Sequence, residues 1–326
     1  MQAIDNLKHH GFFRSCPTSM VSITENMKAT LLSSHKEAML NTPFGRFFSL
    51  FLDKKIKKES MANQNRNLIF DIISKYSVEK DAFKFGEGEN AKFVKFKPKH
   101  VALTFGIPVH GKKVAEVFRK FRFDPDQSSF LVKHNLQACR DIKRNVMKSK
   151  IESLMTEEGS ENDFCRMIIL FMSATIFFPN SNNSIGKSFV VHLENIENIR
   201  KLGWADLIYS ELLRKVKMKK ENPLYCAYVI PLLVWFCEIT GVMEPRKGYI
   251  DGTPRTSYKT LQWTRFKTAE LTMKTDPQNS DFVVECGASR IYEPLHAKDE
   301  RKVSTDQGNS TDILTQKSIF DSSKDK

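Results

Sequence analysis

The stretch from Phe177 to Val191 contains Gly186-Lys187-Ser188, the last three residues of the phosphate-binding loop of many nucleotide-binding proteins. In that loop an earlier glycine opens a turn whose backbone N–H groups surround the phosphates, and the lysine reaches the terminal phosphate. Here Ser181 stands at the position of that glycine. Because Pro179 and the surrounding Asn and Ser residues are ordinary turn formers, we predict a surface turn between packed elements, not a nucleotide site.

Cysteines and histidines are the other residues that could do chemistry. The six cysteines stand singly, without a C-x-x-C pair or the Cys/His spacing of a zinc site: Cys16, Cys139, Cys165, Cys226, Cys237 and Cys286. His134 and Cys139 are the nearest pair for a cysteine nucleophile and its base, but five positions along a helix do not place two side chains on one face. His9, His10 and Cys16 form an even weaker metal candidate. We therefore assign no catalytic residue, no metal and no cofactor, and expect reduced cysteines in an intracellular protein.

The elements that must position any site are mostly helical up to residue 240. Trp204, Ile208, Leu212 and Val216 recur every four residues, and basic residues follow toward the end of the same segment, which is typical of an amphipathic helix. Further helices are predicted at 24–40, 65–77, 133–155 and 160–178. The apolar runs 167–178 and 224–242 are too short, or too interrupted by Pro231 and Glu238, for a membrane span. We expect no membrane partner.

The stretch 83–100 has a different pattern, in which Phe alternates with Lys on both sides of Gly86-Glu87-Gly88. This pattern predicts a β-hairpin, and Pro98 and Gly106 then bound a short helix. Interleaved Phe and Lys also suits a surface that stacks bases and neutralises phosphates. The alternative is a ribbon whose lysines are solvated and whose phenylalanines are buried: Phe83, Phe85, Phe93 and Phe96.

The chain is basic, with 51 Lys and Arg against 38 Asp and Glu, a net charge of +13. Residues 241–326 hold 14 Lys and Arg against 13 Asp and Glu, so the positive charge belongs to the first 240 residues. Such a surface favours nucleic acid or an acidic nuclear protein as partner, although charge runs also form plain solvated faces. The tentative nucleic-acid contacts are Lys54, Lys55, Lys57, Lys58, Lys92, Lys95, Lys97, Lys99, Arg119, Lys120 and Arg122.

Composition also suggests where the chain divides. Beyond about Thr272 polar and charged residues dominate without periodicity, and such a segment buries too little apolar surface to offset the entropy of ordering. We expect a flexible N-terminus at 1–22, a compact, mainly α-helical domain with a small β-hairpin at 23–242, and a largely disordered polar tail at 243–326.

Two regions resemble a known family. Lys92 to Val114 resembles the core of plant transposon-derived domains, the plant mobile domain often labelled aminotransferase-like, in which an aromatic strand precedes a short helix and a glycine-proline turn. The segments 190–216 and 224–240 resemble the second half of the same group. The resemblance spans roughly Thr24 to Thr240, and its matching residues are structural: Gly106, Pro108, Gly111, Trp204 and Trp235.

The resemblance implies a non-catalytic domain of mobile-element origin that binds nucleic acid or chromatin protein in a plant nucleus. A related region precedes a SUMO-type cysteine protease domain, which leaves the alternative of a truncated or accessory part of such a protein that has lost its catalytic domain. That protease needs His, Asp, Gln and Cys in order, and no such series is recognisable here. No lysine has the context of a pyridoxal Schiff base, so the aminotransferase label is not taken as an activity.

Overall fold

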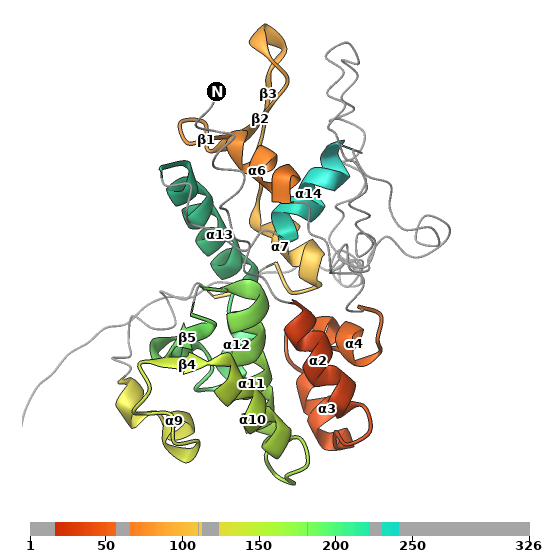
Figure 1. Ribbon diagram of the computed structural model, residues 1–326, viewed down its shortest axis with the longest axis vertical. Coiled ribbons are helices and arrows are strands. Elements are labelled where there is room, and N and C mark those ends of the chain that lie inside the picture. Colours follow the sequence, from red (N-terminus) through yellow and green to blue (C-terminus); the bar gives the residue numbers. More distant parts are fainter. Residues whose placement is uncertain are drawn as a thin grey trace, which may run out of the picture.

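The computed structural model describes residues 17–56, 66–109, 111–112, 124–180, 182–221 and 230–240. Across these residues the protein is mainly α-helical with two small antiparallel sheets, as Figure 1 shows. The predicted fold class is therefore confirmed for the helices and the hairpin. The expected disordered tail at 243–326 and the N-terminal residues 1–16 lie outside the described residues.

One group of elements forms a helical layer, the lower part of Figure 1. It consists of α2 (Pro17–Met27), α3 (Ser33–Leu40), α4 (Gly45–Leu52), η2 (Pro125–Gln127), α9 (Ser129–Lys133), β4 (Asp141–Lys143), α10 (Arg144–Leu154), α11 (Glu161–Met172), η3 (Ser173–Phe177), β5 (Ser184–Gly186), η4 (Lys187–His192) and α12 (Ile196–Lys201). The apolar α11, buried along most of its length, packs against α10 and α3 and continues into the π-helical turn η3. The short strands β4 and β5 pair antiparallel beside it.

A second group carries the hairpin. It consists of α6 (Arg66–Ser74), β1 (Tyr76–Ser77), β2 (Ala82–Phe85), η1 (Gly88–Asn90), β3 (Lys92–Val94), α7 (Pro98–Phe105), α13 (Trp204–Glu221) and α14 (Ile230–Thr240). Both α6 and α7 pack against α13 and α14. The strands form one antiparallel sheet in the order β1-β2-β3, and the β2–β3 hairpin projects beyond the helices in Figure 1.

Five buried rings join the two groups, and we call them the aromatic junction: Phe44, Phe47, Phe105, Phe177 and Trp204. The ring centroids of Phe44 and Trp204 lie 4.9 Å apart, and those of Phe47 and Phe105 lie 5.0 Å apart. Phe177 contacts Phe105 at 5.1 Å. The edge-to-face geometry of these pairs is the favoured one for aromatic rings. The Trp204 indole Nε1 also donates a hydrogen bond to the Ile199 carbonyl at 2.8 Å, so its polar atom is satisfied inside the core.

The local signals around α7 are realised as predicted. Pro98 is the first helical residue, where its missing N–H is no loss. Gly106 ends the helix with φ of 64°, a left-handed conformation that glycine adopts without steric cost. The second predicted tryptophan, Trp235 in α14, is buried against Phe83 and Phe96 of the hairpin segment.

Gly111 has a different reason to be glycine. Its backbone lies against that of Leu202 and Gly203, and a β-carbon at position 111 would lie only 2.4 Å from the Gly203 nitrogen. Hydrogen bonds from Lys112 N to the Lys201 carbonyl and from Gly203 N to the Lys112 carbonyl hold this contact at 2.7 and 2.9 Å. The contact fixes the chain just before Trp204.

Three predicted helices are wrong in extent. The predicted helix 65–77 ends early, because α6 stops at Ser74 and Tyr76–Ser77 pair with β2 as strand β1. The segment 24–40 is broken between α2 and α3, where the Leu32 nitrogen bonds to the Met155 carbonyl of a distant segment instead of continuing a helix. Of the predicted helix 133–155, only the part from Arg144 onward is one, because Ile142 is buried in β4 and pairs with Ile185 of β5. None of the helices that the structure describes combines the length and apolar character needed to cross a bilayer.

Substituting Gly111→Ala is expected to lower the free energy of unfolding by about 1–3 kcal/mol, because the new methyl group must displace backbone rather than a side chain. Gly186→Ala is the matched control. Gly186 has φ of −61°, and a β-carbon added there would lie 3.7 Å from its nearest neighbours, the side-chain oxygens of Asp141 and Ser188. Its effect should lie within about 0.5 kcal/mol. Urea unfolding of both variants measures the difference, and equal stabilities would contradict the close approach at Gly111.

Candidate nucleic-acid interface

The described lysines among the predicted contacts fall into two separate places. Lys54 and Lys55 are exposed residues just after α4, and the others lie between the start of β3 and the first turn of α7. Lys92, Lys95 and Lys97 are exposed there, and Lys99 is partly buried in the first turn of α7. The hairpin lysines thus share one continuous segment, 92–99, whereas Lys54 and Lys55 follow a different helix.

The remaining predicted contacts lie outside the described residues and stay predictions: Lys57, Lys58, Arg119, Lys120 and Arg122. His9, His10 and Cys16, the weak metal candidate, also lie outside them. Within the described ranges there is no group of three His, Cys, Asp or Glu side chains placed to hold a metal ion.

The register of the sheet decides which hairpin side chains share a face. Phe83 lies opposite Val94, and Lys84 lies opposite Phe93. Directly opposed residues of an antiparallel pair point to the same side, and successive residues alternate. Phe83 is buried with its ring centroid 5.0 Å from that of Trp235, so the face of Lys84 and Phe93 is turned away from this packing.

The expectation that four phenylalanines are buried is correct for three of them. Phe83, Phe85 and Phe96 are 6% exposed or less, whereas Phe93 is 45% exposed. The sequence contains the signal that we missed: Phe93 and Phe96 are three residues apart, and an odd spacing cannot place two side chains on one side of a strand. Lys84 was also missed, because the residue that lies opposite Phe93 depends on the register of the two strands.

Positive charge also accumulates where α7 begins. Burial, and then the charges of Lys99 and Lys97, lower the pKa of His100 to about 3, so this imidazole is neutral at physiological pH. The first turn of α7 contains no acidic residue, and its N–H groups carry the positive end of the helix dipole. The segment from Lys92 to Lys99 therefore has a positive potential that favours anions.

Asp81, an acid close enough to feel the charge of Lys95, is already engaged. Asp81 accepts a hydrogen bond from the Tyr76 hydroxyl and pairs with Lys217 of α13 at 3.0 Å. The Tyr76 hydrogen bond, followed by that of Lys217, lowers the pKa of Asp81. Lys95 affects Asp81 only through its charge, so it is not tied up in that hydrogen-bonded pair.

The glycine-lysine-serine triplet has a structural role. The Lys187 ammonium donates to Asp126 Oδ1 at 2.6 Å and to the Gln137 carbonyl at 3.1 Å. Gly186 ends β5 with φ of −61°, without the left-handed turn of an anion-binding nest. The lysine thus connects the start of η4 with η2 and with the backbone at Gln137, and no phosphate loop is present at this position.

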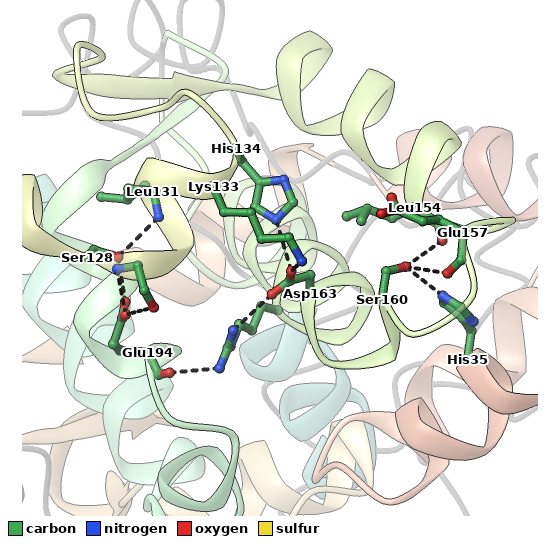
Figure 2. Close-up of polar contacts among 12 residues, drawn as sticks. His35, Ser128, Leu131, Lys133, His134, Leu154, Glu157, Ser160, Asp163 and Glu194 are labelled. Carbon is green, nitrogen blue, oxygen red and sulfur yellow. Dashed lines mark hydrogen bonds and ion pairs between the residues drawn. The ribbon is translucent and has the colours of Figure 1, made fainter.

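A second polar cluster surrounds Asp163 of α11, and Figure 2 shows how its side chains converge. The largely buried carboxylate accepts from Lys133 Nζ at 2.6 Å and from Arg166 Nη1 at 2.9 Å, and His134 Nε2 lies 3.4 Å from it. Burial alone would raise the pKa of Asp163, but the Lys133 hydrogen bond and the neighbouring positive charges outweigh it and lower the pKa. The cluster neutralises a buried charge, and it attaches α9 to α11.

Figure 2 shows two further polar contacts that join elements of the lower layer. Glu194 accepts hydrogen bonds from the hydroxyls of Ser128 and Ser129 at the start of α9. Ser160 Oγ, next to α11, lies 3.0 Å from His35 Nε2 and donates to the Leu154 or Glu157 carbonyl. Because both Ser160 and His35 are buried, this pair has no access to a substrate.

The described cysteines give no support to a thiol nucleophile paired with a histidine. Burial raises the pKa of Cys165 and of Cys237 to about 12, so both are protonated and unreactive. His134, the histidine nearest to Cys139 in sequence, lies against Asp163. Burial lowers the pKa of His134, although Asp163 partly opposes this effect.

Replacing Asp163 by Asn is expected to lower the free energy of unfolding by about 2–4 kcal/mol, because Lys133 and the mostly buried Arg166 lose their counter-charge. Asp126→Asn is the matched control, since it removes the carboxylate of an ion pair whose aspartate side chain is 65% exposed. Its cost should stay below about 1 kcal/mol. Equal losses in denaturant unfolding would mean that the Asp163 cluster is no stronger than a surface pair.

Acid should destabilise the fold through its buried histidines before most carboxylates titrate. Burial lowers the pKa of His192 to about 4 and that of His100 to about 3, both below the ordinary value. Their contribution is fully present above about pH 6.5 and is lost as the pH falls toward the folded pKa, about 1–3 kcal/mol for His192. His192→Phe keeps a ring against Phe189 and Trp204 and should flatten the decline in unfolding free energy between pH 6.5 and 4. An unchanged slope would contradict this assignment.

Comparisons with known proteins identify two regions of the chain. Residues 15–230 match the family described as Domain of unknown function (DUF8566), and residues 268–317 match the Saf4/Yju2 protein family. A curated relative, the splicing factor YJU2 of Dictyostelium discoideum, is 62% identical over 34 residues, which is 10% of this chain and 10% of that protein. The match thus spans about a tenth of that relative's length. No solved structure matches the chain.

These findings correct the resemblance inferred from the sequence. The assignment to the plant mobile domain, a transposon-derived origin and the alternative of a protease remnant are wrong, because the region assigned to them matches DUF8566 and the C-terminal part matches a splicing-factor family. Gly106 caps α7 and the two tryptophans are buried, but the packing around α7, α13 and α14 explains these features without that kinship, and Pro108 is exposed. With about two thirds of its length matched by the family model, the chain belongs to the family Domain of unknown function (DUF8566).

Proposed function

We propose that this protein is a nuclear, spliceosome-associated protein. The observation that carries the proposal is the similarity of residues 268–317 to the Saf4/Yju2 family, together with the 62% identity over 34 residues to a splicing factor. In this proposal the folded part of the protein begins with α2 (Pro17–Met27), and residues 268–317 supply the splicing-factor-like segment. The match covers too little of the relative to transfer its whole activity, so the proposal is association with splicing complexes and not a defined catalytic step.

The charge distribution supports this proposal. The splicing-factor-like segment lies in the part of the chain where Lys and Arg nearly balance Asp and Glu, 14 against 13. The excess of positive charge belongs to the residues before it, where the exposed lysines Lys92, Lys95 and Lys97 lie. A complex built on RNA presents the phosphate charge that such a surface attracts. In the proposal the C-terminal segment selects the complex and the basic domain adds contacts to nucleic acid or to an acidic nuclear protein.

The proposal predicts that the tagged full chain, recovered from nuclear extract at moderate salt, carries spliceosomal small nuclear RNAs in excess over ribosomal RNA. Quantitative reverse transcription measures the enrichment. A variant with residues 268–317 scrambled keeps the composition and charge of the segment, and it should recover no more of these RNAs than an untagged control.

Two results would refute the proposal. One is the absence of enrichment with the full chain, and the other is enrichment that the scrambled variant retains. A fluorescently tagged full chain should also concentrate in the nucleus, and exclusion from the nucleus would contradict the assigned location.

A further inference from the structure

The outer face of the β2–β3 hairpin carries an exposed aromatic ring between lysines. Phe93 lies directly opposite Lys84. Lys95 is the first residue after β3; it is exposed, whereas its neighbours Val94 and Phe96 pack against the core, so Lys95 also faces away from that packing. We call these three residues the Phe93 face. Lys84 and Lys95 are exposed, and Phe93 is 45% exposed.

Packing does not explain why this position holds a phenylalanine. The opposite face of the sheet already contributes Phe83 and Phe85 to the core, where they contact Trp235 and Phe236. A single exposed apolar residue is common in proteins, but this one lies on a projecting hairpin with ammonium groups beside it (Figure 1). Of the nearby acids, Asp81 is engaged by Tyr76 and Lys217, and Glu87 and Glu89 lie at the tip of the hairpin.

The combination has a specific chemical match. Single-stranded nucleic acid offers a base that stacks on an aromatic ring and flanking phosphates that pair with ammonium groups. A duplex hides the faces of its bases, so it would use the lysines and leave the ring without a partner. The ring therefore favours a single strand over a duplex.

We propose that Lys84, Phe93 and Lys95 form a contact for single-stranded RNA, with a base stacked on Phe93 and its neighbouring phosphates on the two lysines. The choice of RNA over single-stranded DNA rests on the proposed association with splicing complexes; the stacking geometry rests on the sheet alone.

A competing explanation comes from the topology of the sheet. β3 is an edge strand in the order β1-β2-β3, and lysines on an edge strand discourage pairing with other chains. In that explanation the lysines have no ligand and Phe93 has no role in binding. The two explanations differ in what happens when the ring alone is removed.

The test is fluorescence anisotropy of the full chain with a labelled single-stranded RNA of about 12 nucleotides and with the matching RNA duplex. The single strand should bind more tightly than the duplex. Phe93→Ala should weaken single-strand binding by about 5- to 100-fold, which corresponds to the loss of one stacked base. Phe93→Trp should restore it, because the larger ring still stacks.

The lysines are tested separately, through the salt dependence of binding. Lys84→Gln combined with Lys95→Gln should reduce the slope of log affinity against log salt by about 1.4, since each phosphate contact with a single strand contributes about 0.7. Leu40→Ala is the matched control for the ring, because Leu40 is 44% exposed and lies on α3 in the other group of elements. Lys36→Gln, an exposed lysine of the same helix, is the control for the charge.

The inference is overturned if the chain does not bind a single strand at about 50 mM salt, if duplex binds equally well, or if Leu40→Ala weakens binding as much as Phe93→Ala. It is also overturned if scrambling residues 268–317 abolishes binding while Phe93→Ala has no effect. Binding that depends on Phe93, without enrichment of spliceosomal RNAs from extract, would support the inference and refute the proposed function. The two therefore fail separately.

Discussion

The fold depends on the aromatic junction. Four separate segments of the chain meet there: α4 brings Phe44 and Phe47, α7 ends at Phe105, η3 ends at Phe177 and α13 begins at Trp204. Each ring is almost completely buried, and each edge-to-face pair adds about 0.5–1.5 kcal/mol to the burial of apolar area. The rings of Phe189 and His192 also contact Trp204, and the backbone hydrogen bonds of Lys112 with Lys201 and Gly203 hold the chain beside the same junction.

Local signals in the sequence were sufficient where a residue acts through its own backbone. Pro98 and Gly106 bound α7 as expected, and the apolar period starting at Trp204 produces α13. Local signals failed where a contact with a distant segment sets the secondary structure. The helical pattern of 133–155 is overruled because Ile142 pairs with Ile185, and the helix 24–40 is interrupted where Leu32 bonds to Met155. Neither partner can be identified from a local window of sequence.

The candidate site was predictable in kind but not in detail. The interleaving of Phe and Lys predicted a basic hairpin, and the odd spacing of Phe93 and Phe96 already required one ring to face outward. Which ring it is depends on the register against β2 and on the position of Trp235, and both are tertiary facts. The structural role of Lys187 could not be predicted either, because its partner Asp126 is 61 residues away in sequence. Family kinship was misjudged since turns and buried tryptophans meet packing needs that many helical domains share.

Helix α13 begins inside the aromatic junction at Trp204, and through Lys217 its far end holds Asp81 at the turn between β1 and β2. Its 18 residues span about 27 Å, so the helix connects the aromatic junction to the turn at Asp81. A tilt of about 5° at the Trp204 end would displace the Lys217 end by about 2 Å. Evolutionary substitutions at the junction thus have a mechanical route to the sheet without altering any residue on its surface.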